Sequence, residues 1–207
     1  MKVCSTHWLI ILTLISFGHE ICAQKISKET NSYVGFIQGY YYNQANECID
    51  GLIRFEYNQN NFFLYKEAYG NKTLKVKAKD VKAFVVLADS FAVLKKFEID
   101  TLFNRSKPLN FKEGFAKVIE KGEVILYRHQ AVINFRIVDS FILTRSSDPK
   151  KTLLTVRKRD SNWFAENLAE YFRDHTDLSS SIKNKELGFK DLRIIVQQYN
   201  KAYSAQD

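Results

Sequence analysis

The side chains of this chain most able to do chemistry are His129, His175 and Cys48, which all lie outside the apolar N-terminal stretch. Nucleophilic catalysis needs a Ser, Cys or Thr beside a histidine that a third group orients. The sequence contains no Gly-x-Ser-x-Gly, and no histidine lies near Cys48 along the chain. We expect His129 to be partly exposed at a strand end, and His175 to end a helix, where an imidazolium ion would favour the dipole. The sequence therefore singles out no catalytic residue.

Metal ligation needs clustered His, Cys or carboxylate side chains, and the chain offers one local pair, His175 and Asp177. A lone pair is insufficient, and we expect Asp177 to cap a helix instead. The sequence contains no calcium loop, phosphate-binding glycine loop or dinucleotide fingerprint. We therefore predict no metal and no cofactor.

Several carboxylates could meet only in the folded protein: Asp50, Glu56, Asp89, Glu98, Asp100 and Asp139. Two of them in one cleft could act as the acid and base of a glycoside hydrolase. This hydrolase is the alternative function, and it requires a deep, apolar-walled cleft in which two carboxylates converge. Solvated surface positions are the better expectation for each residue. Whether the chain is an enzyme is left open, with a non-enzymatic role favoured.

A row of lysines is the first pattern that suggests binding. Lys75, Lys77 and Lys79 alternate with apolar residues, so a strand here would turn its lysines to one side. Such a row is typical of an exposed strand, whose lysines also protect a sheet edge from aggregation. Because the net charge is +8, the functional alternative is contact with anionic lipid headgroups or acidic glycans. Nucleic acid fits poorly, since the sequence has no recognition motif.

Aromatic residues are the second such pattern. Residues 33–69 contain eleven of the 29 Phe, Tyr and Trp residues, about twice an even share. Core packing and strand propensity explain most of this enrichment. A flat aromatic platform for a sugar or a peptide is the alternative, with Tyr40 and Tyr42 as its candidates.

The N-terminus indicates export. Lys2 precedes an apolar run from Trp8 to Phe17, and Ala23 offers a small residue for cleavage. This is typical of a secretory signal peptide, which is too short to span a bilayer permanently. We expect residues 1–23 to be removed and residues 24–32 to form a flexible N-terminus. Cys48 would then be the only cysteine, so no intramolecular disulfide is expected.

Residues 33–160 favour strands, because β-branched and aromatic runs alternate with turn residues. Hairpins are indicated at Asp89-Ser90, at Lys121-Gly122 and across Ser146–Lys151, and Asp100–Gly114 indicates a long connection. About eight to ten strands at this spacing predict an antiparallel sheet. It would curl into a roll, an open barrel or a sandwich-like form.

Residues 161–207 favour helices. Phe164, Leu168 and Phe172 recur every four residues, which places one apolar stripe on a helix from Trp163 to Phe172. Two further helices are predicted over Asp177–Asn184 and Phe189–Tyr203. The predicted fold class is therefore α+β, a curled antiparallel sheet followed by about three C-terminal helices that pack on it.

The order of these elements carries four short motifs. They are Gly39-Tyr40 at the first strand, the segment Lys79 to Phe84, the Val118-x-x-x-Gly122-x-x-x-Leu126-Tyr127 hairpin, and Leu168 to Asp174 followed by Tyr199-Asn200. In this order the chain resembles a class of exported Bacteroidota proteins of unknown activity. The resemblance implies an envelope or secreted location and a β domain with a helical end. It also implies a cysteine after the aspartate of the closing helix, where this chain has His175. Packing alone is therefore expected to hold that helix.

We expect an exported, non-enzymatic binding or interaction protein, located in the periplasm, at the outer membrane or outside the cell, without a transmembrane span after signal cleavage. Its partner would be an anionic envelope glycan, a lipid surface or another envelope protein. The candidate ligand contacts are Lys75, Lys77, Lys79, Tyr40 and Tyr42.

Overall fold

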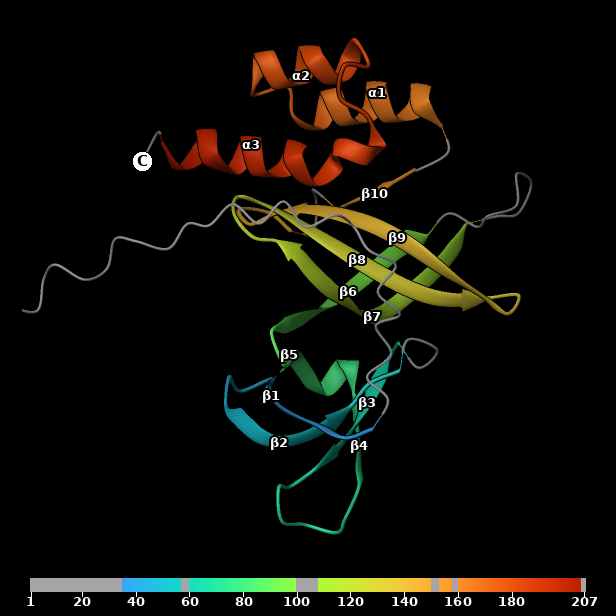
Figure 1. Ribbon diagram of the computed structural model, residues 1–207, viewed down its shortest axis with the longest axis vertical. Helices are drawn as coiled ribbons and strands as arrows, with labels where there is room; N and C mark the ends of the chain where they lie inside the picture. Colours follow the sequence, from blue (N-terminus) through green and yellow to red (C-terminus); the bar gives the residue numbers. More distant parts are fainter. Residues whose placement is uncertain (1–34, 57–59, 100–107, 150–152, 158–159, 206–207) are drawn as a thin grey trace, which may run out of the picture. The chain divides into compact units, whose positions relative to one another are not determined.

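The computed structural model describes residues 35–56, 60–99, 108–149, 153–157 and 160–205. The expected signal peptide, the expected flexible segment 24–32 and the first part of the expected connection, residues 100–107, lie outside them. Within the described residues, ten strands are followed by three α-helices (Figure 1). The predicted α+β class, with an antiparallel sheet before the helices, is confirmed.

All ten strands belong to one antiparallel sheet with the order β10-β9-β8-β7-β6-β5-β1-β2-β3-β4. The strands are β1 (Ile37–Asn43), β2 (Cys48–Arg54), β3 (Phe62–Lys66), β4 (Leu74–Lys77), β5 (Val81–Val86), β6 (Asp89–Ile99), β7 (Leu109–Glu120), β8 (Val124–Ile133), β9 (Arg136–Arg145) and β10 (Leu154–Val156). The sheet is open, because β4 and β10 are its two edges. A short 3₁₀ turn, η2 (Ala78–Asp80), leads from the edge strand β4 to β5, which pairs with β1.

The turns differ from the predicted ones in two places. The first hairpin turns at Leu87 and Ala88, so Asp89 already belongs to β6 and is paired with Val86. Its apolar character made Leu87 look like a strand residue, although its φ of 55° suits a turn. In addition, β7 begins at Leu109, so the long connection ends earlier than Gly114. The hairpins at Lys121-Gly122 and across Ser146–Lys151 are confirmed by the β7–β8 and β9–β10 pairs.

The first core lies inside the curl of β1 to β5. The Phe84 ring is at its centre, 4.5 Å from the Phe91 centroid and 4.9 Å from both Phe63 and Phe115. Tight curvature depends on glycine at Gly51, where an added Cβ would lie 2.5 Å from the carbonyl oxygen of Lys66. Of the aromatic residues between positions 33 and 69, Phe55, Phe63 and Tyr65 are buried in this core and Tyr41 packs against it.

The second core lies on the C-terminal half of the sheet. It combines buried residues of β6, β7, β8 and β9, among them Phe97, Ile99, Ala116 and Ile142. Strands β6 and β7 serve both cores, since Phe91 and Phe115 point into the first. The two cores therefore share strands and are not separate domains.

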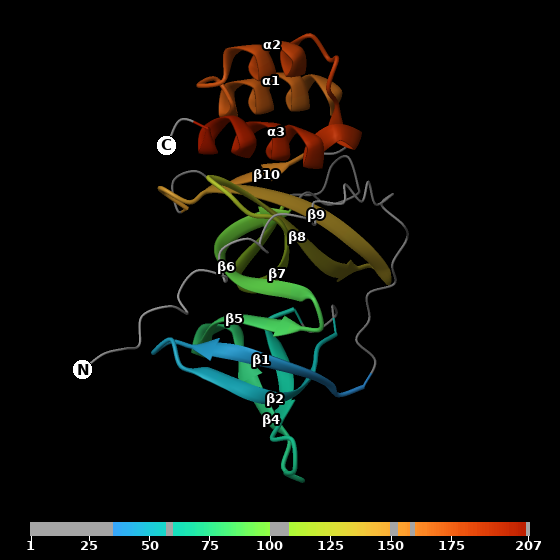
Figure 2. The ribbon, with the colours of Figure 1, turned by 60° about the vertical axis from the view of Figure 1, so that its left-hand side comes forward.

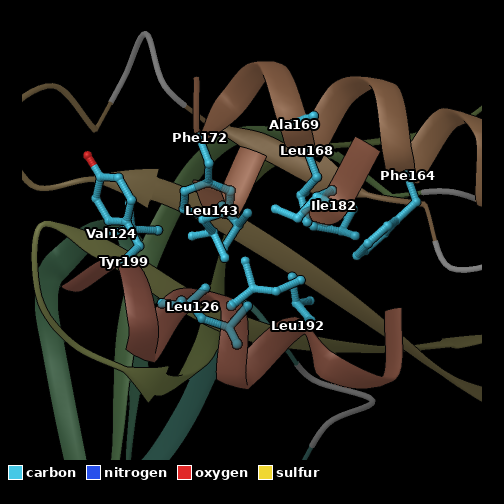
Figure 3. Close-up of a cluster of buried hydrophobic side chains, with 14 residues drawn as sticks. Val124, Leu126, Leu143, Phe164, Leu168, Ala169, Phe172, Ile182, Leu192 and Tyr199 are labelled. Carbon is cyan, nitrogen blue, oxygen red and sulfur yellow. The ribbon is translucent and has the colours of Figure 1, made fainter. Parts of the chain in front are cut away.

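The third core lies between the other face of the C-terminal strands and the helices α1 (Ser161–Tyr171), α2 (Thr176–Lys183) and α3 (Leu192–Ser204). Figure 3 shows Phe172, directly after α1, at Leu143 of the sheet, and Phe164 and Leu168 of α1 by Ile182 of α2. Phe164, Leu168 and Phe172 are at most 4% exposed, so the predicted apolar stripe is buried. Helix α3 lies nearest β7 and β8, while α1 packs mainly on α2 (Figure 2).

Polar contacts also hold the helices, contrary to the expectation that packing alone would do so. The Arg145 guanidinium on β9 donates to both carboxylate oxygens of Asp174 at 3.0 Å. It also donates to the hydroxyl of Tyr199 and, at 2.6 Å, to the carbonyl of Tyr171. Tyr199 donates in turn to Asp174 at 2.6 Å. One arginine thus joins the sheet to α1, to α3 and to the turn after α1, through the bidentate geometry that only arginine offers.

A second polar contact joins α3 to the β7–β8 turn. The Asn200 side chain accepts from the backbone N–H of Val124 and donates to its carbonyl, both at 2.8 Å, as a neighbouring strand would. An added Cβ at Gly122 would overlap the Asn200 carboxamide. Gly122 of the hairpin motif and Asn200 of the final helix are therefore in contact. This contact explains why glycine and asparagine occupy these two positions.

Candidate functional site

The predicted lysine row lies at a sheet edge. Lys75 and Lys77 are exposed on β4, on the side opposite Val76, which packs on the first core. Lys79 does not continue the row, because the chain enters η2 at the buried Ala78. The lysine side of β4 is therefore two residues long, and Lys79 stands apart on the turn.

Neighbouring strands extend this edge into a larger basic surface. The outer side of β2 and β3 carries Arg54, Phe62 and Lys66, since Ile53, Phe63 and Tyr65 turn inward. Together with Phe36, just before β1, these residues form what we call the basic–aromatic face: Phe36, Arg54, Phe62, Lys66, Lys75 and Lys77. The register places Lys75 of β4 opposite Leu64 of β3, and Leu64 opposite Arg54 of β2. The cations therefore lie on three consecutive strands, β2, β3 and β4.

The cations of the basic–aromatic face rest on its rings. The Lys75 ammonium lies 3.7 Å from the Phe62 ring centroid, and the Lys66 ammonium 4.6 Å from that of Phe36. The Arg54 guanidinium also lies over Phe36, at 5.5 Å. Such contacts orient the cations while their charge stays near the surface. Arg54 has one acidic neighbour, Glu56, at 3.5 Å.

Tyr40 and Tyr42 share the outer side of the sheet but not this face. Their rings form an edge-to-face pair at 5.7 Å on β1. Tyr40 is opposite Asp50, four residues along β2 from Arg54, which is about 13 Å at the usual strand rise. Strands β2 and β3 separate them from β4. The structure therefore does not bring the candidate tyrosines and lysines together.

Cys48 lies beside the tyrosine pair. It is exposed at the start of β2, opposite Tyr42. Cys48 is the main cause that raises the pKa of Tyr42, followed by desolvation. No catalytic partner accompanies this cysteine among the described residues, because His129 and His175 both lie on other strands and helices.

His129 is not at a strand end, as expected, but fully buried within β8. The β7–β8 ladder stops at Lys117 and Arg128, and the imidazole fills the space where the strands diverge. Its Nδ1–H donates to the Phe115 carbonyl at 2.8 Å, which leaves Nε2 to accept from the Asn60 amide at 3.3 Å. Burial lowers the pKa of His129, so the neutral ring is the stable form. It is a structural residue.

His175 also differs from its expected place. It precedes α2 as the N-cap residue, and its Nδ1 accepts from the backbone N–H of Leu178 at 3.4 Å. The expected place at the end of a helix is therefore wrong, because His175 precedes α2 and caps its first turn. Asp177 lies in the first turn of α2 but is not the cap. The part of the chain that the structure describes contains no group of three potential metal ligands.

The carboxylates that a hydrolase would need lie apart. Asp89 forms an ion pair with Lys117 at 2.7 Å, and Asp139 accepts from Gln130 at 2.5 Å. Glu98 lies at the other end of β6 from Asp89, about 30 Å along the strand at the usual rise. Asp89 and Glu98 therefore do not converge. Asp100 lies outside the described residues.

A cavity of about 210 Å³ lies where β6, β10 and the start of α1 meet. Ile99, Leu153 and Trp163 line it, and Glu98 is the one carboxylate among its described lining residues. The Arg157 guanidinium lies 5.3 Å from the Trp163 ring centroid at this site. A glycosidase needs two carboxylates, and the described lining supplies one.

Comparisons with protein-family models, with curated proteins and with solved structures found no match to this chain. Among the described residues, no helix has both the length and the apolar character needed to cross a membrane. The strongest candidate site is therefore argued from its own geometry, which is that of the basic–aromatic face. Alternation along the sequence predicted Lys75 and Lys77, whereas Phe36, Arg54, Phe62 and Lys66 were not predicted. Alternation around the apolar Ile53, Phe63 and Tyr65 was the available signal for three of these four.

Proposed function

We propose that this chain is an exported binding protein whose basic–aromatic face binds an acidic glycan of the cell envelope. The observation that carries the proposal is the grouping of four cations, Arg54, Lys66, Lys75 and Lys77, on adjacent strands around two phenylalanine rings. The net charge of +8 supports it, because a basic protein attracts a polyanion from a distance.

The arrangement of the cations suits a repeating anionic polymer. Neighbouring strands lie about 4.8 Å apart, and alternate residues on one strand about 6.6 Å, so the charges form a short lattice. Lys66 and Lys75 rest on Phe36 and Phe62, which reduces the conformational entropy that they lose on binding. The face lies on the outer side of the curled strands, which suits a chain-like ligand better than a small molecule that needs a concave site.

The experiment compares binding to an acidic and to a neutral polysaccharide at low and high salt. The double variant Lys75→Glu/Lys77→Glu should lower the affinity for the acidic polymer by roughly tenfold or more at low salt, because attraction becomes repulsion. The difference should shrink at high salt, where exposed charges are screened. Affinity is measured by calorimetry or by biolayer interferometry.

The matched control is Lys121→Glu/Lys190→Glu, which changes the net charge equally at two exposed lysines outside the face. It should retain most of the affinity. Equal losses in the two double variants would mean that net charge, and not this face, attracts the polymer. Equal binding of acidic and neutral polymers by the native protein would contradict the proposal.

A further inference from the structure

The turn between β8 and β9 exposes large apolar side chains. We call residues 132–137 the β8–β9 tip. Phe135 at its end is completely exposed, at 103% of its reference area, and Ile137 and Val132 are 61% and 46% exposed. Water-exposed side chains of this size are ordinary when scattered but informative when contiguous. The tip lies at the end of the strands away from the helices (Figure 1).

The backbone of the tip is also unusual. Asn134 and Phe135 form a two-residue turn in which both φ angles are positive, 49° and 60°. Glycine is the usual residue at the second position, because a Cβ disfavours this conformation. A phenylalanine held there has no burial to compensate for the strain within the described structure. The side chain at this position is therefore not explained by folding.

The apolar surface of the tip surrounds its end and does not form a single face. Val132 is paired with Ile137 on one side of the hairpin, and Ile133 with Arg136 on the other, with Phe135 beyond both pairs. A convex protrusion of this kind can be surrounded by a fluid medium without a complementary pocket. The strands stay paired up to Ile133 and Arg136, so few backbone groups would be desolvated.

We propose that the β8–β9 tip inserts into the interfacial layer of an anionic lipid bilayer. Phe135, Ile137 and Val132 would enter the boundary between headgroups and acyl chains, as apolar side chains of peripheral proteins do. Arg136 is exposed beside them and would pair with lipid phosphates while its stem lies along the apolar layer. The tip and the basic–aromatic face are on different strands, so this inference is independent of the proposed function.

Flotation with lipid vesicles tests the inference. The protein is purified in its exported form, from which the expected signal peptide has been removed. Vesicles of phosphatidylcholine alone are compared with vesicles that also contain phosphatidylglycerol. The variant Phe135→Gly should bind the anionic vesicles more weakly by roughly tenfold or more, because one buried aromatic ring is lost. Glycine suits this turn, so the variant should melt no lower than the native protein. Loss of binding would then not reflect loss of folding.

Leu87→Gly is the matched control, because Leu87 is also apolar, 69% exposed and at positive φ, but in the β5–β6 turn. The β7–β8 register places that turn near the opposite end of β8. Leu87→Gly should bind vesicles like the native protein. A tryptophan at position 135, Phe135→Trp, should show a blue-shifted emission with anionic vesicles, whereas Leu87→Trp should not.

Three results would overturn the inference. They are the absence of native binding to either vesicle, native-like binding by Phe135→Gly, and equal losses in Phe135→Gly and Leu87→Gly. Sedimentation is measured alongside. A native dimer that Phe135→Gly converts to a monomer, without vesicle binding, would assign the tip to self-association instead.

Discussion

At the scale of single residues, His129 is the clearest case in which surroundings decide the role of a side chain. The imidazole is enclosed by the rings of Phe97 and Phe111, with centroid distances of 4.8 Å and 5.0 Å. Its hydrogen bonds with Phe115 and Asn60 use both nitrogens of the neutral ring. Protonation of Nε2 would remove its ability to accept the hydrogen bond from Asn60. It would also place a positive charge among aromatic rings. The residue therefore stabilises the fold only in its neutral form.

This environment predicts a loss of stability in mild acid. Burial lowers the pKa of His129 below its unfolded value of about 6.5, so between these two pKa values the unfolded chain binds more protons. Stability should therefore fall as pH drops below about 6.5. In His129→Gln, the decrease in melting temperature between about pH 7.5 and pH 5.5 should be smaller than in the native protein. An unchanged decrease in His129→Gln would show that another group causes it.

At the scale of elements, short polar contacts determine how the helices meet the sheet. Arg145 joins β9 to α1, α3 and the turn after α1, and Asn200 joins α3 to the β7–β8 turn. Asn200 forms two hydrogen bonds with the backbone of one residue, Val124, so its side chain imitates a strand neighbour. Apolar packing supplies most of the stabilising area. These directional contacts set the position of α3 on the sheet, because hydrogen bonds tolerate little displacement.

The contact between Gly122 and Asn200 is testable by a double-mutant cycle. Gly122→Ala should cost about 1–3 kcal/mol, because the new Cβ overlaps a carboxamide that hydrogen bonds hold in place. Asn200→Ala alone should also destabilise, since it leaves the Val124 backbone without its partner. In the Asn200→Ala background, Gly122→Ala should cost much less. Chemical denaturation measures all four free energies of unfolding. Additive effects would mean that the two residues are not coupled.

At the scale of the whole molecule, one open sheet carries three hydrophobic cores. The first lies within the N-terminal curl, the second on β6 to β9 and the third under the helices. Strands β6 and β7 contribute Phe91 and Phe115 to the first core and Leu94 and Ala116 to the second. If a strand shared by two cores loses its packing in one core, the packing of the other core is also disturbed. We therefore expect the cores to unfold together.

Hydrogen exchange tests this cooperativity. Phe63→Ala removes a ring that is 1% exposed in the first core, at a cost of about 3–5 kcal/mol. If unfolding is cooperative, the slowest amides of α1, in the third core, should exchange roughly a hundredfold to several thousandfold faster. Mass spectrometry of the helical peptides measures this. Tyr69→Ala, at a fully exposed ring, should leave the rates unchanged. Native rates in α1 of Phe63→Ala would show that the helices unfold separately.

Much of the fold follows from local pattern. Alternation predicts which side of β2 and β4 is buried, and four-residue spacing predicts the buried stripe of α1, because periodicity reports the side on which a residue lies. The turn at Lys121-Gly122 was predicted because glycine marks it, whereas the turn expected at Asp89-Ser90 lies two residues earlier, at Leu87 and Ala88. The β8–β9 turn was missed because phenylalanine occupies the position where glycine is usual.

The sequence by itself determined the fold class, the buried stripe of the helices and the lysine side of β4, since each depends on the order of residues along one segment. Only the tertiary structure decided which residues from different strands and helices lie next to one another. The register of β2, β3 and β4 groups Arg54, Phe62 and Lys75 and leaves Tyr40 apart. The divergence of β7 and β8 buries His129. The physical reason is that strand order and register arise from packing between distant segments, which no local period records.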